Sequence, residues 1–154
     1  MRLTAYTDYS LRVLIRLALR PGSLATIGEI ARIYAVSEHH LMKVVHQLGL
    51  AGYVETVRGR GGGLRLAKNP EDINVGEVVR RMEPDFGIVA CFRGSGSCAI
   101  EPACVLAEAL DQALAAFMAV LDRYTLADLI RRPSQLLALL KMRPAETSRP
   151  RAGH

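Results

Sequence analysis

Apolar residues recur at intervals of three and four near the start of the chain, which is the period of an amphipathic helix. The first segment with this pattern predicts a helix over about residues 8–20. Thr7 would cap this helix, and Asp8 would lie in its first turn, where a carboxylate is favoured by the helix dipole. Pro21 and Gly22 mark its end.

Two further helical segments follow, separated by a short turn. Thr26 and Glu29 have the spacing of a capping box, which predicts a short helix to about residue 33. Ser37 would cap a second helix through residue 50, and this pair predicts a helix-turn-helix whose second helix reads DNA. A solvated helix face is the alternative reading. The residues expected to contact DNA here are Thr26, Ser37, Glu38, His39, His40 and Lys43.

A hairpin is predicted directly after the helix-turn-helix. Residues 53–58 and 64–66 favour strand, and the glycine-rich residues 59–63 form the turn between them. A hairpin in this place is the wing of a winged helix, and its glycines let the backbone approach a phosphate closely. A flexible tip with no partner is the alternative. The residues expected against the DNA backbone are Arg58, Arg60, Gly61 and Gly62.

The second half of the chain predicts more helices. Asn74 and Glu77 have capping-box spacing before a helix to about residue 82, and two short helices are expected after Thr125 and Pro133. Pro102 is placed as the first residue of a long helix whose apolar stripe needs a partner, either a second copy of the chain or the core of its own chain. This stripe contains Leu106, Leu110, Leu114, Phe117, Leu121 and Tyr124. The predicted fold is mainly α with a small β-hairpin wing: a winged helix-turn-helix DNA-binding domain plus a long dimerisation helix.

Composition indicates a globular chain, and its charge distribution favours a nucleic-acid partner. The 154 residues carry a formal net charge of +5. Residues 1–70 hold ten Lys and Arg against four Asp and Glu, so the positive charge lies with the predicted DNA-binding elements. Apolar runs are far shorter than a membrane span and no signal peptide pattern is seen, so we expect a cytoplasmic protein without a membrane partner. No nucleophile–base pair, nucleotide loop or pair of acids indicates an enzyme.

All three cysteines lie in one segment rich in glycine and serine: Cys91, Cys98 and Cys104. Thiols stay reduced in the cytoplasm, so three close together are more suited to binding a metal than to forming disulfides. Soft thiolates select zinc, copper(I) or iron–sulfur clusters, and three of them leave one ligand to be supplied from elsewhere. The paired C-x-x-C spacing common in zinc sites is absent. A zinc site and three ordinary thiols are the alternatives.

Several short motifs, taken in their order along the chain, indicate a known family. They are Thr4-Ala5-Tyr6-Thr7-Asp8-Tyr9, Gly52-Tyr53-Val54 leading into Arg58-Gly59-Arg60-Gly61-Gly62-Gly63, and Cys91, Cys98 and Glu101-Pro102-Ala103-Cys104. Together they resemble the IscR/NsrR family of dimeric winged-helix repressors that carry iron–sulfur clusters. Residues 121–129 are similar to the nitric-oxide-sensing branch of that family. The resemblance covers about residues 1–140.

The resemblance implies an iron–sulfur cluster on the three cysteines, with Asp8 of the other subunit as its fourth ligand. A 4Fe–4S cluster is favoured and a 2Fe–2S cluster is the alternative. The IscR branch has a histidine three residues after its last cysteine, where this chain has Ala107, which argues against an IscR-type site. From residue type alone, a favourable place at a helix start is sufficient to explain Asp8.

These expectations combine into a homodimeric repressor that binds a near-palindromic operator in double-stranded DNA and senses nitric oxide through its cluster. The alternatives are a regulator of the same class that senses redox or iron status, and a cluster-free thiol-redox regulator. We expect residues 1–83 to form the DNA-binding domain and residues 84–103 to form the cluster-binding loop. Residues 104–142 would hold the dimerisation helix and the C-terminal helices, and residues 143–154 would be a disordered tail.

Overall fold

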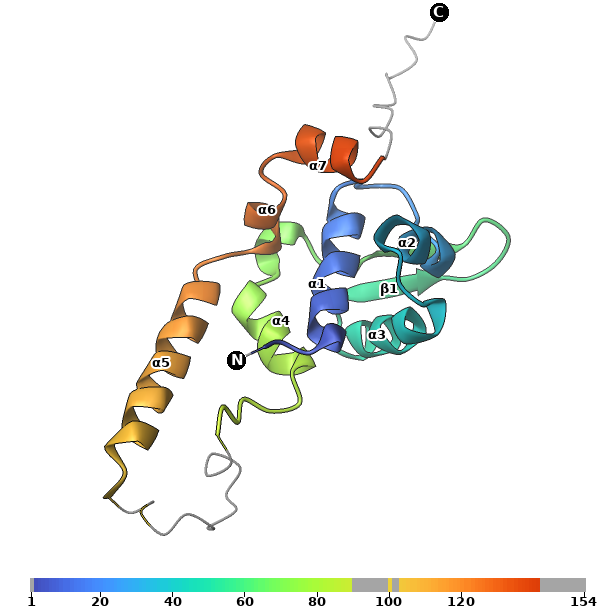
Figure 1. The fold of residues 1–154 in the computed structure, drawn as a ribbon. Coiled ribbons are helices and arrows are strands. Elements are labelled where there is room, and N and C mark those ends of the chain that lie inside the picture. The colour runs from blue at the N-terminus through green and yellow to red at the C-terminus, as the bar shows by residue number, and fades with distance from the viewer. Residues whose placement is uncertain (1, 90–99, 101–102, 142–154) are drawn as a thin grey trace, which may run out of the picture.

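The computed structural model describes residues 2–89, 100 and 103–141, and within these ranges the chain is mostly helical with one antiparallel hairpin (Figure 1). The predicted fold class is confirmed. The elements in chain order are α1 (Ala5–Ala18), α2 (Ile27–Tyr34), α3 (Glu38–Leu50), β1 (Val54–Val57), β2 (Gly63–Leu66), the 3₁₀ helix η1 (Pro70–Asp72), α4 (Val75–Met82), α5 (Val105–Leu121), α6 (Leu126–Leu129) and α7 (Pro133–Leu139).

Helix α1 is the centre of the core. It packs against α3, α4, α6 and β2, and Figure 1 shows it between α4 on one side and α2, α3 and the hairpin on the other. Val13 and Leu14 are completely buried on its inner face. Leu126 of α6 belongs to the same buried cluster, so the core includes a residue that follows the long helix α5 in sequence. The predicted division into domains stays a prediction.

The start of α1 differs from the prediction. Thr4, and not Thr7, is the N-cap: its Oγ1 accepts a hydrogen bond from the backbone N–H of Thr7 at 3.3 Å. Thr7 is buried, and its hydroxyl donates to the carboxylate of Glu83. Both threonines have the residue type of a cap, and only the distant partner decides between them. Asp8 remains in the first turn, as predicted.

The helix-turn-helix is formed as predicted. Thr26 and Glu29 make both hydrogen bonds of the capping box at the start of α2. Ala35 adopts a left-handed conformation with φ 53° and turns the chain toward α3. Ser37 is at the predicted N-cap position of α3, but its side chain makes no capping hydrogen bond. The side chains that α3 buries recur at helical spacing: Leu41, Val44, Val45 and Leu48.

The hairpin pairs Val54 with Leu66 at its base and Val57 with Gly63 beside its turn. Leu64 also pairs with Ala25, just before α2, in a two-way backbone exchange with N···O distances of 2.8 and 3.1 Å. This bridge fixes the base of the hairpin to the segment that leads into α2.

A polar junction joins α4 to the end of α5. The Arg80 guanidinium donates two hydrogen bonds of 2.6 Å to the Asp122 carboxylate, and Asn74 Nδ2 donates to the Asp122 carbonyl at 2.7 Å. Asn74 Oδ1 also accepts from the Glu77 N–H at 3.0 Å, which is one half of the predicted capping box. The predicted long helix was expected to include Tyr124. It ends at Leu121 instead, and the Tyr124 carbonyl beyond it accepts the Val75 N–H at 2.9 Å.

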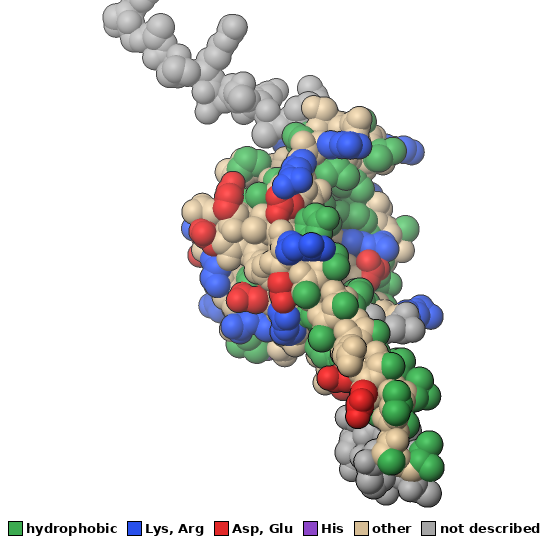
Figure 2. All heavy atoms as spheres, turned by 90° about the vertical axis from the view of Figure 1, so that its left-hand side faces the viewer, with side chains coloured by type: hydrophobic (Ala, Val, Ile, Leu, Met, Phe, Trp, Pro, Cys, Tyr) green, Lys and Arg blue, Asp and Glu red, His purple; other side chains and the backbone are tan. Residues whose placement is uncertain are grey.

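Helix α5 projects from the body of the molecule, and hydrophobic side chains gather along it (Figures 1 and 2). Val105 and Leu106, near its start, are 74% and 64% exposed, whereas Met118 is buried against the body. Pro102, the predicted first residue of this helix, lies outside the described residues, as do residues 143–154. Thr125 caps α6 with a complete capping box, and Pro133 is the first residue of α7, as predicted. No helix within the described ranges has the length and hydrophobicity needed to cross a membrane.

Candidate functional site

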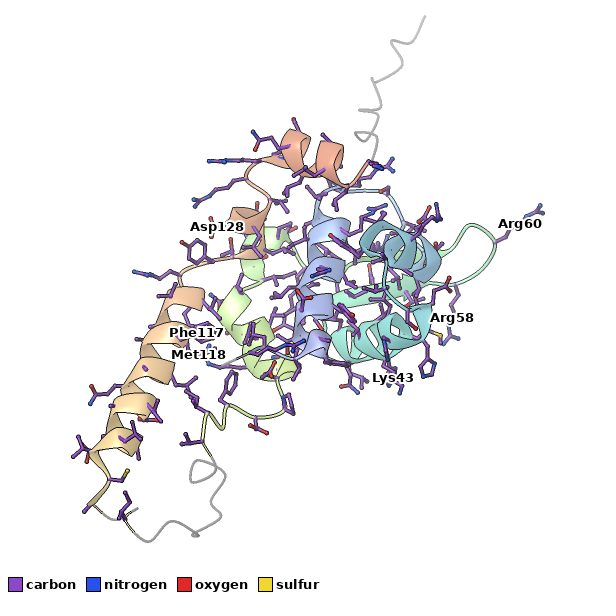
Figure 3. The ribbon with its side chains drawn as sticks, viewed as in Figure 1. Lys43, Arg58, Arg60, Phe117, Met118 and Asp128 are labelled. Atoms are coloured by element: carbon purple, nitrogen blue, oxygen red, sulfur yellow. The ribbon has the colours of Figure 1, made fainter. Side chains whose placement is uncertain are left out.

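The outward face of α3 presents polar side chains to solvent. His39, His40 and Lys43 are exposed, and the two imidazole rings lie 6.3 Å apart between centroids at 52° to each other. Figure 3 shows Lys43 on the side of α3 that faces away from the body. Each exposed imidazole offers ring nitrogens for hydrogen bonding, the kind of group that can read base edges in the major groove.

The position of α3 is tied to the start of α1. The Tyr6 hydroxyl donates a hydrogen bond to the backbone carbonyl of Lys43 at 3.1 Å. Burial raises the pKa of Tyr6 above its ordinary value, so the phenol keeps its proton and stays a donor. This hydrogen bond therefore links the first turn of α1 directly to the backbone of α3.

The predicted contacts at the helix starts are all exposed. Thr26 and Ser37 are the N-caps of α2 and α3, and Glu38 is the first residue of α3. A Cβ on Gly28 would lie 3.3 Å from Glu38 Oε1, so the Glu38 carboxylate lies against the first turn of α2. The first turns of both helices are thus gathered on one side of the helix-turn-helix.

The wing carries Arg58 and Arg60, both exposed (Figure 3). Arg60 projects from the tip of the loop, away from the body. Gly61 has φ 77°, a conformation that costs a residue with a side chain about 1–2 kcal/mol. A Cβ on Gly62 would lie 2.2 Å from the Val57 carbonyl oxygen, so no side chain fits there. The two glycines allow the tight turn that follows the two arginines, with Arg60 at its tip.

The Asp8 carboxylate is held by Arg12, one turn further along α1. Arg12 Nε and Nη2 lie 3.1 and 2.8 Å from its two oxygens, yet the Asp8 side chain remains 46% exposed. The Arg12 guanidinium also lies over the rings of Tyr9 and Tyr34, at 5.9 and 5.7 Å from their centroids. Asp8 and Arg12 line a surface hollow of about 580 Å³ together with Tyr34, the last residue of α2. The carboxylate is therefore accessible and is connected to the helix-turn-helix through Arg12.

Of the three cysteines, the structure describes Cys104 alone; Cys91 and Cys98 lie outside the described residues. Cys104 is a half-buried free thiol at the N-cap of α5, and its side chain makes no capping hydrogen bond. Figure 1 shows the start of α5 at the far end of the projecting helix, well away from the start of α1. Among the described residues, no three metal-binding side chains come together in one chain. One chain therefore does not bring Asp8 and Cys104 to the same place.

Sequence reasoning missed several residues at this site. Arg12 and Tyr34 surround Asp8, and Glu83 binds the first turn of α1. The i,i+4 spacing of Asp8 and Arg12 is a signal that the sequence does contain. Tyr34 and Glu83 have no local signal, because their partners are distant in the chain.

Comparison with known proteins decides the family. Residues 3–132 match the model of the Rrf2 family, described as iron-dependent transcriptional regulators. The chain belongs to the Rrf2 family. It is 57% identical over 145 residues to the HTH-type transcriptional regulator NsrR of Bacillus subtilis (strain 168), covering 93% of this chain and 99% of that protein. The resemblance recognised in the sequence is thereby confirmed.

Solved structures of the Rrf2 family agree in fold. IscR of T. potens superposes with a TM-score of 0.70 at 26% identity, covering 88% of this chain and 90% of that one. The oxidized form of Staphylococcus aureus CymR gives a TM-score of 0.69 at 26% identity, covering 85% and 97%. This Rrf2-family chain is thus a transcriptional regulator. Its relatives are named as regulators and not as enzymes, which confirms the prediction that it is not an enzyme.

Proposed function

We propose that this protein is a homodimeric repressor that binds a near-palindromic operator and loses affinity when nitric oxide attacks an iron–sulfur cluster. The observation that carries the proposal is the placement of two donors. Asp8 is accessible at the start of α1, and Cys104 is a free thiol at the start of α5, in a different part of the chain. The likeness to NsrR over nearly the whole chain supports the same reading.

The donors suit an iron–sulfur cluster. Thiolate sulfur is the ligand that such clusters prefer, and Cys104 has no hydrogen bond to the helix it precedes that would compete for its sulfur. Cys91, Cys98 and Cys104 would hold the cluster with Asp8 as the fourth ligand, and a 4Fe–4S form is favoured over 2Fe–2S. When bound, the cluster supplies iron that reacts with nitric oxide.

A second copy of the chain would complete the site. The exposed apolar side chains along α5 need a cover, and two α5 helices packed together would provide it. In a two-fold dimer each chain would present its Asp8 to the cysteine segment of the other. Separation of Asp8 and Cys104 within one chain is what this arrangement requires.

The residues around Asp8 connect its carboxylate to the DNA-binding elements. Arg12 binds the carboxylate and lies over the Tyr34 ring, and Tyr34 immediately precedes the left-handed turn at Ala35. Burial is the main cause that raises the pKa of Tyr34, so the ring stays a neutral partner for the guanidinium. When the carboxylate moves, Arg12 moves with it and changes its contact at the end of α2. The angle between the two α3 helices of a dimer would change in response.

DNA contact is assigned to two surfaces. His39, His40 and Lys43 of α3, with Thr26, Ser37 and Glu38 at the helix starts, would face the major groove, and base edges there distinguish sequences. Arg58 and Arg60 of the wing, with Gly61 and Gly62, would contact phosphates. Two α3 helices related by a two-fold axis predict half-sites about one helical turn apart.

Anaerobic purification tests the cluster. We expect a coloured protein. Each of the variants Cys91→Ala, Cys98→Ala and Cys104→Ala should lose the visible absorbance and should bind the operator more weakly. Iron and sulfide measured per chain distinguish 4Fe–4S from 2Fe–2S. If all three variants keep a full cluster, the assignment is wrong. A colourless protein whose DNA binding responds to thiol oxidation would favour the cluster-free alternative, for which the likeness to the oxidized form of CymR is a precedent in fold.

Mixed dimers test whether Asp8 acts across the dimer. In a heterodimer of Asp8→Ala and Cys91→Ala chains, both defects fall on one site and the other site keeps a complete ligand set. Recovery of about half of the clusters per mixed dimer is expected if the ligand comes from the partner. If Asp8→Ala alone already shows a normal spectrum, Asp8 returns to the role of a helix-start carboxylate. If both parent variants lack the cluster and the mixed dimer recovers none, Asp8 acts within its own chain and not across the dimer.

A further inference from the structure

The carboxylate of Glu83 binds the first turn of α1 through three donors. The backbone N–H of Thr4 lies 3.2 Å from both carboxylate oxygens, and the Thr4 hydroxyl donates to Oε2 at 3.1 Å. The buried Thr7 hydroxyl donates to the same oxygen. These hydrogen bonds join residues that are 76 and 79 positions apart in sequence. A negative charge at this place also suits the positive end of α1.

Glu83 stands where the DNA-binding domain leads into the cysteine segment. It is the C-cap of α4, with an extended backbone of φ −82° and ψ 127°, and Pro84 follows it. Residues 83–88 and residues 2–4 line a common hollow of about 230 Å³, so the start of the chain and the beginning of the cysteine segment face each other. Glu83 thus connects the start of α1 to the segment that leads toward the cysteines.

The hydrogen bonds of Glu83 also affect the backbone at Asp8. The backbone N–H of Asp8 donates to the Thr4 carbonyl at 3.1 Å, which is the first hydrogen bond of the helical ladder of α1. Glu83 holds Thr4, and Thr4 in turn holds the backbone of Asp8. Removing the carboxylate frees the N-cap and the third residue of the helix together, and the first turn is the part of a helix most prone to fray.

We propose that Glu83 is a positioning residue for Asp8: it fixes the first turn of α1, and thereby sets where the Asp8 carboxylate is presented to the partner chain. This role rests on the proposed function, in which Asp8 is a ligand across the dimer. Glu83 touches neither the cluster nor Asp8 itself, so its effect passes through Thr4 and Thr7. The cysteine segment follows Glu83 in the sequence. Glu83 therefore connects α1, whose Asp8 would bind the partner's cluster, to the segment that would bind the cluster of its own chain.

The test compares Glu83→Ala and Glu83→Gln in the cluster-loaded dimer. Visible circular dichroism reports the ligand geometry of the cluster, and loss of iron to a chelator reports how firmly the cluster is held. We expect Glu83→Ala to change the spectrum as Asp8→Asn does and to speed iron loss on the order of tenfold, the lower end of the effect for residues that orient metal ligands. Glu83→Gln retains an acceptor oxygen and should recover most of the wild-type behaviour.

Asp128→Ala is the matched control. Asp128 is likewise a carboxylate bound to a threonine at a helix start, with its Oδ2 accepting from the Thr125 N–H at 2.7 Å and the Thr125 hydroxyl at 3.1 Å. It lies in α6, and we expect its loss to lower thermal stability while leaving the cluster spectrum unchanged. If Asp128→Ala and Glu83→Ala change the spectrum equally, general loosening of the fold is the cause and the proposal is wrong.

The double variant separates the proposal from its premise. If Glu83 acts through Asp8, Glu83→Ala combined with Asp8→Asn should lose iron no faster than Asp8→Asn alone. If the double variant lost iron faster than Asp8→Asn by the same factor that Glu83→Ala alone produces, Glu83 would act independently of Asp8 and the proposal would be wrong. A change with Asp8→Asn but none with Glu83→Ala would overturn it while keeping Asp8 as a ligand. An unchanged spectrum with Asp8→Asn would remove the ligand role of Asp8, and the role of Glu83 with it.

Discussion

Replacing Gly62 by alanine should disrupt the wing and weaken DNA binding without disturbing the cluster. A Cβ at this position would lie 2.2 Å from the Val57 carbonyl oxygen and 2.9 Å from the Gly59 carbonyl oxygen. Both obstacles are backbone atoms of the hairpin, so a rotamer change cannot relieve the contact. The strands must shift, and overpacking of this kind typically costs about 1–3 kcal/mol.

Thermal unfolding measures this cost. For a chain of this size, each kcal/mol lowers Tm by about 2–4 °C. Two other glycines serve as controls. A Cβ on Gly49 of α3 would have its nearest contact at an ordinary 3.7 Å, so Gly49→Ala should raise Tm through a helix propensity gain of up to about 1 kcal/mol. Gly61 has open space but φ 77°, so Gly61→Ala measures backbone strain without the clash.

The DNA-binding result should follow the stability result. Gly62→Ala should displace Arg58 and Arg60 from the positions proposed to contact DNA phosphates, so affinity should fall for operator and unrelated DNA alike, with a flatter salt dependence. The visible spectrum of the cluster should stay that of the wild type. If Tm is unchanged in Gly62→Ala while Gly49→Ala behaves as expected, the hairpin geometry described above is wrong.

Three further outcomes are expected. Arg58→Ala and Arg60→Ala should each weaken binding to all sequences and reduce the salt slope by about 1, in a binding titration against salt; altered base preference instead would assign these residues to base reading. Arg16 is 4% exposed, its Nε and Nη1 have no hydrogen-bond partner among the described residues, and burial is the main cause that lowers its pKa. Arg16→Met should therefore keep or raise Tm, and a clear drop would reveal a partner for Arg16 in the dimer. The hydrogen bond from Arg80 holds the pKa of Asp122 in the folded protein below its ordinary 3.8. The pair therefore stabilises the fold fully at pH values above 3.8, and this stabilisation is lost as the pH falls through the pKa of Asp122 in the folded protein. Asp122→Asn should flatten the acid side of a plot of Tm against pH for the cluster-free protein, and an unchanged acid limb would contradict that reading.

The winged helix could be predicted from the sequence because its signals are local. Thr26 and Glu29 are three residues apart, and their capping box forms as the spacing indicates. The buried face of α3 likewise follows from its apolar period. Helix ends were less predictable: α5 stops at Leu121, and the Tyr124 carbonyl beyond it pairs with the distant Val75 N–H.

The cysteine segment stands out in the sequence because all three thiols lie in one glycine- and serine-rich stretch, and its role as a cluster site stays a prediction. The residues that present Asp8 could not be found in this way. Arg12 lies one turn from Asp8 and pairs with it, but i,i+4 pairs of this kind are common on solvated helix faces and identify no site. The contact of Arg12 with Tyr34 depends on how α1 packs beside α2, which no local pattern encodes.

Glu83 shows why residues that contact a distant segment cannot be found from the sequence alone. It follows a helix and precedes a proline, where an exposed carboxylate would be unremarkable, and its partners Thr4 and Thr7 are at the other end of the DNA-binding domain. Thr7 has the residue type of a helix cap, yet Glu83 takes its hydroxyl and leaves the cap to Thr4. The same contact that shifts the start of α1 also sets the first turn in which Asp8 stands. In a dimer built with Asp8 as a ligand across the interface, each Glu83 would connect one chain's loop to the other chain's cluster. Loss of one cluster would then loosen the Asp8 that the same chain presents to the other cluster.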